Sequence, residues 1–358
     1  MEKEDLEVHC ERTREVARYA YDHRVPFSYI KSELHWRTLD RAVRNVLGTE
    51  VAALTCAQIM DGLPIADVAY DQRLPGLFGE HPIEDLHEEL CPGTMDKARE
   101  FYENWDPYFL RFDPKVVHQY EEAVPGTKPF NLRLIELVAV SLHQVGAELF
   151  KLDFRLHDGD IESILNWMPD TPLYANTKPR PTLFAHPHYF DYDIYPEGLA
   201  DVAGYWTEDR ILGGVAVFDR RLADDESNPP NVYFHSCHDY VTNRVCQLLD
   251  EQQQALIDFF LSDPRSDHCP LPVLTDKRNR TRLDWWDAHT HHQVYRDVWE
   301  RKPLTIDDIM SLERRPRGET DYPEIGDAIF RINGQLGIPL PRPPPRKSLS
   351  PSPSPREE

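Results

Sequence analysis

The sequence predicts an α+β protein with a helical N-terminal half, and with a small mainly antiparallel sheet and a long helix in the C-terminal half. Two observations predict this class. Helical apolar spacing dominates the chain up to Phe150, whereas short β-branched and aromatic runs begin only at Pro181. The order of helices, strands and a final helix also lacks the repeating βαβ pattern of a parallel sheet.

The N-terminal half contains several segments that we expect to be helical. The strongest, residues 131–150, is apolar nearly all round, as is typical of a helix in the middle of a domain. Charged and polar residues interrupt it too often for a bilayer span of roughly 20 apolar residues. The other expected helices are residues 4–21, 32–47, 51–60, 94–105 and 114–122, and residues 61–93, rich in Pro, Gly and Asp, are expected to be irregular.

The C-terminal half carries the strand signals. Residues 239–261 space apolar side chains such as Val241, Val245 and Leu256 so that they form one stripe on a helix, which Pro264 ends. Before this helix, we expect strands at residues 181–186, 200–206, 211–218 and 232–235, with a turn at residues 207–210.

Residues 1–338 are expected to form a single globular domain, and residues 339–358 a disordered tail rich in Pro, Ser and Arg. The tail has too few large apolar side chains to order itself. Such a tail is typical of ligands for SH3-like or WW-like modules. One hypothesis is therefore a non-catalytic interaction protein.

The chain is strongly acidic, with a net charge of −22 and a pI of about 5.1. Such a surface repels phosphate backbones and anionic lipid, which argues against a dedicated nucleic-acid or membrane-surface protein. The six cysteines are scattered without a CxxC pair, and the N-terminal MEKED is the reverse of a secretory leader. We therefore expect reduced cysteines and a cytoplasmic protein.

A first polar cluster joins three histidines to two carboxylates. His289, His291 and His292 are followed by Asp297 and Glu300. Imidazole and carboxylate groups are usual metal ligands, and carboxylates three residues apart share one face of a helix. A His/carboxylate metal-dependent biosynthetic enzyme is therefore a hypothesis, and a solvated histidine-rich loop is its alternative.

Two further clusters contain chemically active side chains. His235, Cys237, His238 and Asp239 stand where a strand is expected to meet the long helix, whose N-terminus would lower the pKa of a thiol. Capping and packing are the alternative interpretation. The third cluster consists of His186, His188, Asp191, Asp193 and Glu197, which stand among aromatic residues, a mixture suited to a cationic or aromatic amino acid. A solvated acidic loop is the alternative interpretation.

The stretch YPEGLADVAGYWTEDRILGGVAVFDR at residues 195–220 resembles a large group of filamentous-fungal proteins, many of which look like members of secondary-metabolite gene clusters. The similarity continues through YRDVWERKP at residues 295–303 and DYPE at residues 321–324. Within that group, the chain resembles the fungal arginine-containing cyclodipeptide synthases. Their DDxxE motif matches Arg296-Asp297-Val298-Trp299-Glu300, with Arg296 in place of the first Asp.

This resemblance implies a tRNA-dependent cyclodipeptide synthase that forms an arginine-containing diketopiperazine in secondary metabolite biosynthesis. It implies Asp297 and Glu300 as catalytic carboxylates. Substrate binding would fall to Trp285, Trp286, Tyr295, Arg296 and Trp299. The partners would be arginyl-tRNA and a second aminoacyl-tRNA, held by the basic residues Lys277, Arg278, Arg280 and Arg282. Aminoacyl esters are already activated, so no cofactor is expected, and no P-loop, GxSxG or HExxH motif occurs.

Overall fold

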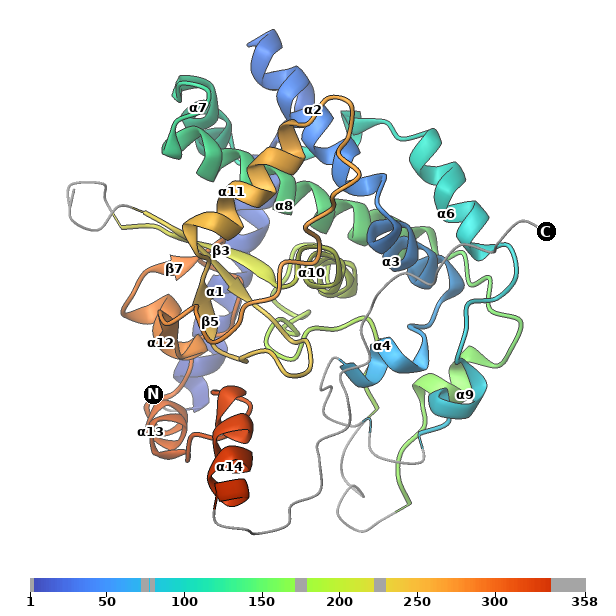
Figure 1. Cartoon of the computed structure of the whole chain (residues 1–358), viewed down its shortest axis with the longest axis vertical. Helices are drawn as coiled ribbons and strands as arrows, with labels where there is room; N and C mark the ends of the chain where they lie inside the picture. Colours follow the sequence, from blue (N-terminus) through green and yellow to red (C-terminus); the bar gives the residue numbers. More distant parts are fainter. Residues whose placement is uncertain (1–2, 72–76, 78–80, 171–178, 222–229, 336–358) are drawn as a thin grey trace.

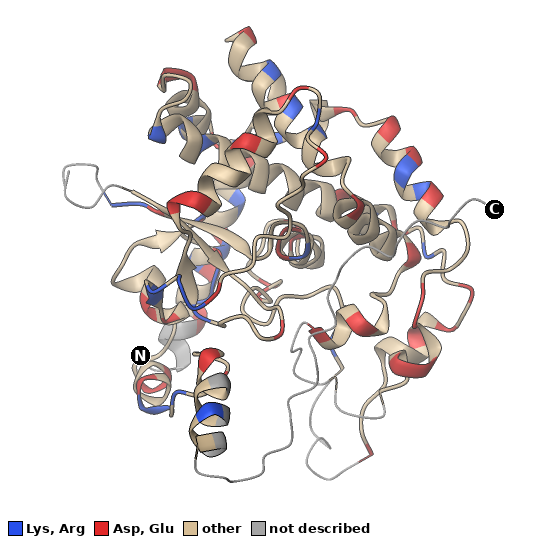
Figure 2. Cartoon of the chain, in the orientation of Figure 1, with Lys and Arg blue, Asp and Glu red and all other residues tan. Residues whose placement is uncertain are grey.

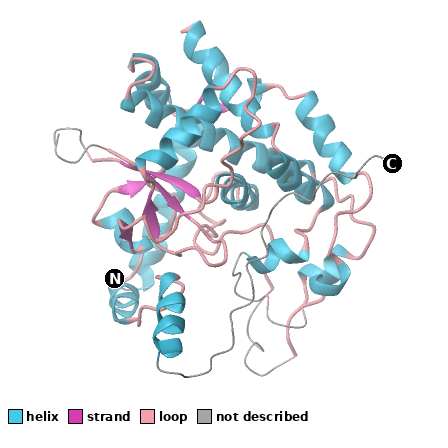
Figure 3. Cartoon of the chain, viewed as in Figure 1, coloured by secondary structure: helices cyan, strands magenta, loops and turns pink. Residues whose placement is uncertain are grey.

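The computed structural model describes residues 3–71, 77, 81–170, 179–221 and 230–335. The predicted tail at residues 339–358 lies outside the described residues. Helices fill the N-terminal half and the larger, antiparallel sheet forms from Val215 onward, which confirms the expected α+β class (Figure 3). None of the described helices combines the length and the apolar composition needed to cross a bilayer.

The N-terminal half follows most of the predicted helices. They are α1 (Lys3–Asp22), α2 (Glu33–Leu47), α3 (Glu50–Asp61), α6 (Thr94–Glu103), α7 (Pro114–Glu122) and α8 (Lys128–Leu152). The expectation of an irregular stretch at 61–93 is partly wrong, because it holds the short helices α4 (Ala66–Asp71) and α5 (Ile83–Leu86). This half also contains η1 (Phe27–Tyr29), η2 (Pro107–Phe109), α9 (Ile161–Leu165) and the paired strands β1 (Val25–Pro26) and β2 (Arg111–Phe112).

The larger sheet has the strand order β6-β5-β4-β3-β7, with every neighbouring pair antiparallel. In the β3–β4 pair, the register runs from Val215 opposite His235 to Phe218 opposite Val232. The strands are β3 (Val215–Asp219), β4 (Val232–His235), β5 (Val245–Gln247), β6 (Arg282–Leu283) and β7 (Val294–Tyr295). The helices of this half are α10 (Leu199–Leu212), α11 (Asp250–Leu261), α12 (Trp285–Thr290), α13 (Ile306–Arg314) and α14 (Glu324–Gln335).

Three predictions for the C-terminal half are wrong. The expected strand at 200–206 and turn at 207–210 together form helix α10. The expected strand at 181–186 is reduced to one bridge between His186 and Tyr189. The long helix expected over 239–261 begins only at Asp250, because strand β5 pairs with β4 and β6 instead.

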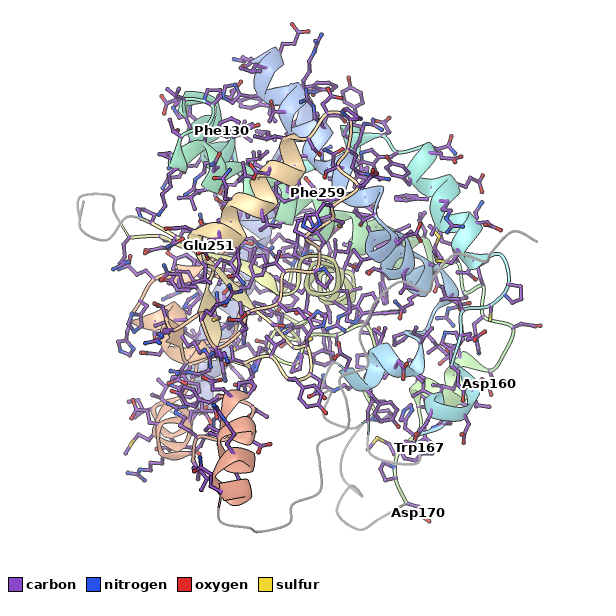
Figure 4. All side chains as sticks on the ribbon, in the orientation of Figure 1. Phe130, Asp160, Trp167, Asp170, Glu251 and Phe259 are labelled. Atoms are coloured by element: carbon purple, nitrogen blue, oxygen red, sulfur yellow. The ribbon has the colours of Figure 1, made fainter. Side chains whose placement is uncertain are left out.

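Helix α10 lies at the centre of the molecule and is seen end-on in Figure 1. It packs against α8, α3 and β3. Close approach to α8 requires small residues, since a Cβ added to Gly204 would lie 2.7 Å from the carbonyl oxygen of His143. The main group of buried apolar side chains surrounds this contact and includes Phe130 on α8 and Phe259 on α11 (Figure 4).

Candidate functional site

Helix α10 carries charged side chains into the interior of the protein. Asp201, Glu208, Asp209 and Arg210 are each no more than 5% exposed. Charged residues are almost never so deeply buried unless they are paired. These four side chains and their partners form what we call the α10 cluster, and the partners come from several parts of the fold.

On one side of α10, the cluster reaches helix α8 and the loop after β7. His143 Nε2 donates to Asp201 Oδ1 at 2.9 Å. The Arg296 guanidinium pairs with Glu208 and lies over the ring of Tyr205, 4.9 Å from its centroid. The carboxylates of this side therefore have a charged or hydrogen-bonding partner within the protein.

On the other side, the cluster joins α4 to the segment after β4. Arg210 donates to Asp209 Oδ2 at 2.9 Å and to Asp71 Oδ2 at 2.6 Å. Cys237 Sγ donates to Asp209 Oδ2 at 3.0 Å, and His238 Nδ1 donates to Asp71 Oδ2 at 2.9 Å. Asp209 and Asp71 thus share one arginine between them.

The prediction that Cys237 lies beside a helix N-terminus is wrong, because α11 begins only at Asp250. Burial, reinforced by Asp209, raises the pKa of the Cys237 thiol well above its ordinary value. A thiol that stays protonated is a poor nucleophile. Cys237 is therefore a packed hydrogen-bond donor in this structure.

The loop at residues 296–301 turns most of its charged side chains inward. Glu300 Oε2 accepts the backbone N–H groups of Arg296 at 2.9 Å and Asp297 at 3.2 Å, which closes the loop on itself. Arg301 donates to the hydroxyl oxygen of Tyr189 at 2.6 Å and to His235 Nδ1 at 3.2 Å. The loop is thereby fixed against the protein interior.

Three histidines lie beside Arg301. The rings of His188 and His235 stack with centroids 4.5 Å apart, and His186 Nε2 donates to the carbonyl oxygen of His235 at 3.0 Å. Burial lowers the pKa of His186 to about 4 and holds the pKa values of His188 and His235 well below the ordinary value. All three rings are therefore neutral at pH 7.

Two neighbouring acids on α10 titrate very differently. Burial raises the pKa of Glu208 to about 7, against the opposing charge of Arg296. Burial acts in the same direction on Asp209, but the charges of His238 and Arg210 outweigh it and lower the pKa of Asp209 to about 2. Strongly perturbed pKa values gather at functional sites, and acids with separated pKa values suit acid–base chemistry.

The two carboxylates expected to be catalytic differ in exposure. The side chain of Asp297 is 25% exposed, and its Oδ2 lies 3.6 Å from Arg296 Nε. Glu300 is fully buried and accepts the loop amides. Asp297 can therefore touch a substrate, whereas Glu300 is placed to position the loop.

The residues expected to bind substrate are mostly inside the protein. Trp286 and Trp299 are buried, and Arg296 is occupied by Glu208. Trp285 is partly buried under the guanidinium of Arg301, 5.6 Å from its ring centroid. Tyr295, also partly buried, has its ring 4.9 Å from that of His289. Of this set, Trp285 and Tyr295 retain accessible surface.

The three histidines of the first polar cluster are divided between two contacts. His291 Nδ1 lies 2.7 Å from Asp287 Oδ1, and His292 Nε2 lies 3.1 Å from Asp287 Oδ2. His289 Nε2 instead lies 3.2 Å from the carbonyl oxygen of Val298. Within the described chain, none of the three belongs to a group of three or more converging metal donors.

The basic run expected to hold tRNA is partly neutralised. Arg278 pairs with Asp276 and Arg282 with Glu324, each with an N–O distance of 3.0 Å. Lys277 and Arg280 are exposed. Acidic residues also occur along many of the helices (Figure 2).

A groove of about 400 Å³ adjoins the loop at residues 296–301 and is lined by Glu7, Cys10, Glu11, Arg14, Asp193 and Lys302. Asp191 and Asp193 both meet Lys302: its backbone N–H donates to Asp191 at 2.9 Å, and its Nζ pairs with Asp193 at 2.6 Å. Glu197, expected in the same cluster, pairs instead with Lys151 on α8. Part of the third cluster therefore gathers at this groove.

Sequence reasoning singled out none of Asp61, His87, Cys91 and His157, yet their donor atoms lie within 4.8 Å of one another. The local signal is His87 followed by Cys91 four residues later. Asp61 and His157 are too distant in the sequence for spacing to link them. Only the fold brings the four together.

Comparison with family models, curated proteins and solved structures finds no match to this chain. The function must therefore be inferred from side-chain geometry.

Proposed function

We propose that the chain is an enzyme whose active centre combines the loop at residues 296–301 with the adjacent groove. The observation that carries this proposal is the position of Asp297, a partly exposed carboxylate beside Arg296, whose guanidinium pairs with the buried Glu208, an acid whose pKa is raised to about 7. Asp193 in the groove is paired with Lys302, but Glu7 and Glu11 also line it, and carboxylates favour a cationic substrate.

In its specific form, the proposal is tRNA-dependent synthesis of an arginine-containing cyclic dipeptide. The α-amine of one aminoacyl ester attacks the carbonyl carbon of the other, the ester C–O bond breaks, and the tRNA leaves with its hydroxyl. A second attack of the same kind closes the ring. Asp297 would bind the guanidinium of the arginyl group, because a guanidinium pairs with a carboxylate through two parallel hydrogen bonds. Glu300 is a positioning residue that holds the loop.

Expression in a bacterial host, which supplies charged arginine tRNA, tests this proposal by mass spectrometry of culture extracts. We expect a new arginine-containing cyclic dipeptide from the wild-type chain and roughly 100-fold less from Asp297→Asn, as for loss of a substrate-orienting group. Asp287→Asn is the matched control, because Asp287 is a carboxylate on α12 whose side chain pairs with the exposed His291 and His292. This control should give the wild-type yield.

A folded wild-type protein that yields no such product would remove the synthase proposal. Product at the wild-type level from Asp297→Asn would show that Asp297 does not bind the substrate. In cell extracts, ribonuclease should abolish the product, and synthesis from free amino acids after ribonuclease treatment would contradict the use of tRNA.

A further inference from the structure

Four segments that are distant in the sequence meet beside the end of α3. Asp61 is the last residue of that helix, and Gly62 follows it with φ of 101°. His87 directly follows α5, and Cys91 lies in the turn before α6. His157 lies between α8 and α9, and its backbone N–H donates to the carbonyl oxygen of Asp61 at 2.9 Å.

The donor atoms of these four residues all lie within 4.8 Å of one another, as the ligands of one metal ion must. Asp61 Oδ2 and His87 Nε2 are 3.4 Å apart, and Cys91 Sγ and His157 Nδ1 are 3.3 Å apart. Zinc bonds of about 2.0–2.3 Å place the ligand atoms of a tetrahedron roughly 3.3–3.8 Å from one another. We propose that Asp61, His87, Cys91 and His157 bind one Zn²⁺ ion.

The charge of Asp61 supports a cation at this position. Asp61 is fully buried, and in the described part of the chain its carboxylate pairs with no lysine or arginine. Its Oδ2 accepts the backbone N–H of Cys91 at 3.0 Å, and its Oδ1 is buried without any hydrogen-bond partner. Buried carboxylates are normally paired or coordinate a metal.

A second group of donors, His186, Asp209 and Cys237, is also compact. It differs in electrostatics, because the Arg210 guanidinium already lies 2.9 Å from Asp209 and 3.8 Å from Cys237 Sγ. A metal ion there would be repelled by a neighbouring positive charge. A metal ion would therefore bind more favourably beside Asp61 than beside Arg210.

The donor set and its burial indicate the kind of site. One thiolate, two imidazoles and one carboxylate suit a borderline ion, and four protein ligands leave no open position for substrate. Binding requires Cys91 to release its proton to solvent, and the ion replaces the contact of 3.2 Å between His87 Nε2 and the Leu63 carbonyl oxygen. Cys91 and His157 are only partly buried, which gives the ion a way in. The metal would therefore link α3 to the segments before α6 and α9.

Metal analysis of the full chain, purified without a histidine tag from zinc-supplemented cells, tests this site. We expect about one zinc per chain in the wild type and less than about a tenth of that in Cys91→Ser and Asp61→Asn, since each change removes one of four ligands. Cys269→Ser and His268→Ala are matched controls, because both residues are exposed and lie outside the site. They should retain the wild-type zinc content.

A spectroscopic measurement keeps the test decisive if a variant fails to fold. Wild-type protein stripped with a chelator and titrated with Co²⁺ should develop the visible bands of a tetrahedral ion and a thiolate-to-cobalt charge-transfer band. Both should be unchanged in Cys269→Ser. Wild-type protein that holds less than about a tenth of an equivalent of zinc and shows no thiolate band would overturn the proposal.

Discussion

At the scale of single residues, the unusual feature is the pairing of buried charges on α10. Glu208 and Arg296 are both buried and face each other. The two partners are not equivalent, since an arginine cannot give up its charge in a protein, whereas a buried carboxylic acid can take up a proton. Burial raises the pKa of Glu208 to about 7, so this side chain is close to taking up a proton at neutral pH.

We therefore expect Glu208→Gln to change stability at pH 7 by no more than about 1 kcal/mol, because the neutral side chain is already half populated there and Asp297 still lies 3.6 Å from Arg296. Arg296→Met should cost more, since it removes the partner of both carboxylates and the contact with the ring of Tyr205. Urea unfolding of both variants measures the difference. Glu33→Gln, which removes an exposed partner of Arg37, should change stability by less than about 1 kcal/mol. Equal costs for Glu208→Gln and Arg296→Met would contradict this account.

Because several histidines are buried, we expect the stability of the protein to depend on pH. Burial lowers the pKa of His186 to about 4, whereas an unfolded chain titrates near 6.5, so acid favours the unfolded state. The stability that neutral His186 contributes is complete above pH 6.5 and is lost as the pH falls to 4. The loss should reach about 3 kcal/mol for this one group. Urea midpoints between pH 7 and 4 should fall less steeply in His186→Asn, and an unchanged slope would argue against the assignment.

At the scale of elements, α10 depends on two glycines where it crosses α8. A methyl group on Gly204 would lie 2.7 Å from a backbone carbonyl oxygen of α8, so the helices would have to separate. The same is true of Gly146, where the added carbon would overlap Thr207. The backbone of α8 therefore leaves no room for a side chain at Gly204, and the side chain of Thr207 leaves none at Gly146.

Gly204→Ala should therefore destabilise the protein by roughly 1–3 kcal/mol, the usual cost of overpacking. Thermal melting checks this. Gly318→Ala is the matched control, because an added Cβ there meets no atom within 4 Å. A melting temperature of Gly204→Ala equal to that of the control would show that α8 and α10 can move apart freely.

Sequence patterns identified the helices that bury an apolar stripe and the largely apolar α8, but they missed α10, which buries charged residues. Helices α2 and α7 show clear apolar stripes and ended close to where they were expected. Helix α10 is buried all round and carries charged residues inside, so its pattern indicated a strand and an exposed turn. The candidate zinc site was missed for a related reason, since Asp61 and His157 meet only through the packing of α3 against the segment after α8.

At the scale of the whole molecule, charge is the dominant feature. The chain carries a net charge of −22, and its surface acids lie on many different elements (Figure 2). Self-repulsion of this kind opposes the compact state. The charged residues of α10 contribute little to it, because they are compensated inside the fold.

Salt should therefore stabilise this protein. Raising NaCl from about 10 mM to 150 mM shortens the screening length from roughly 30 Å to 8 Å, which weakens repulsion between distant acids. We expect the melting temperature to rise over this range at pH 7. A fall would mean that surface ion pairs such as Lys97 with Glu100 outweigh the general repulsion.

The central position of α10 has a consequence for the protein while it is being made. Helix α8 leaves the ribosome before α10, and the side of α8 that packs against α10 has no cover until the chain has been synthesised past Leu212. At roughly 5–20 residues per second, that interval lasts several seconds, during which an exposed helical surface invites association with other chains. The nascent chain should therefore engage chaperones in this interval and release them once α10 has emerged.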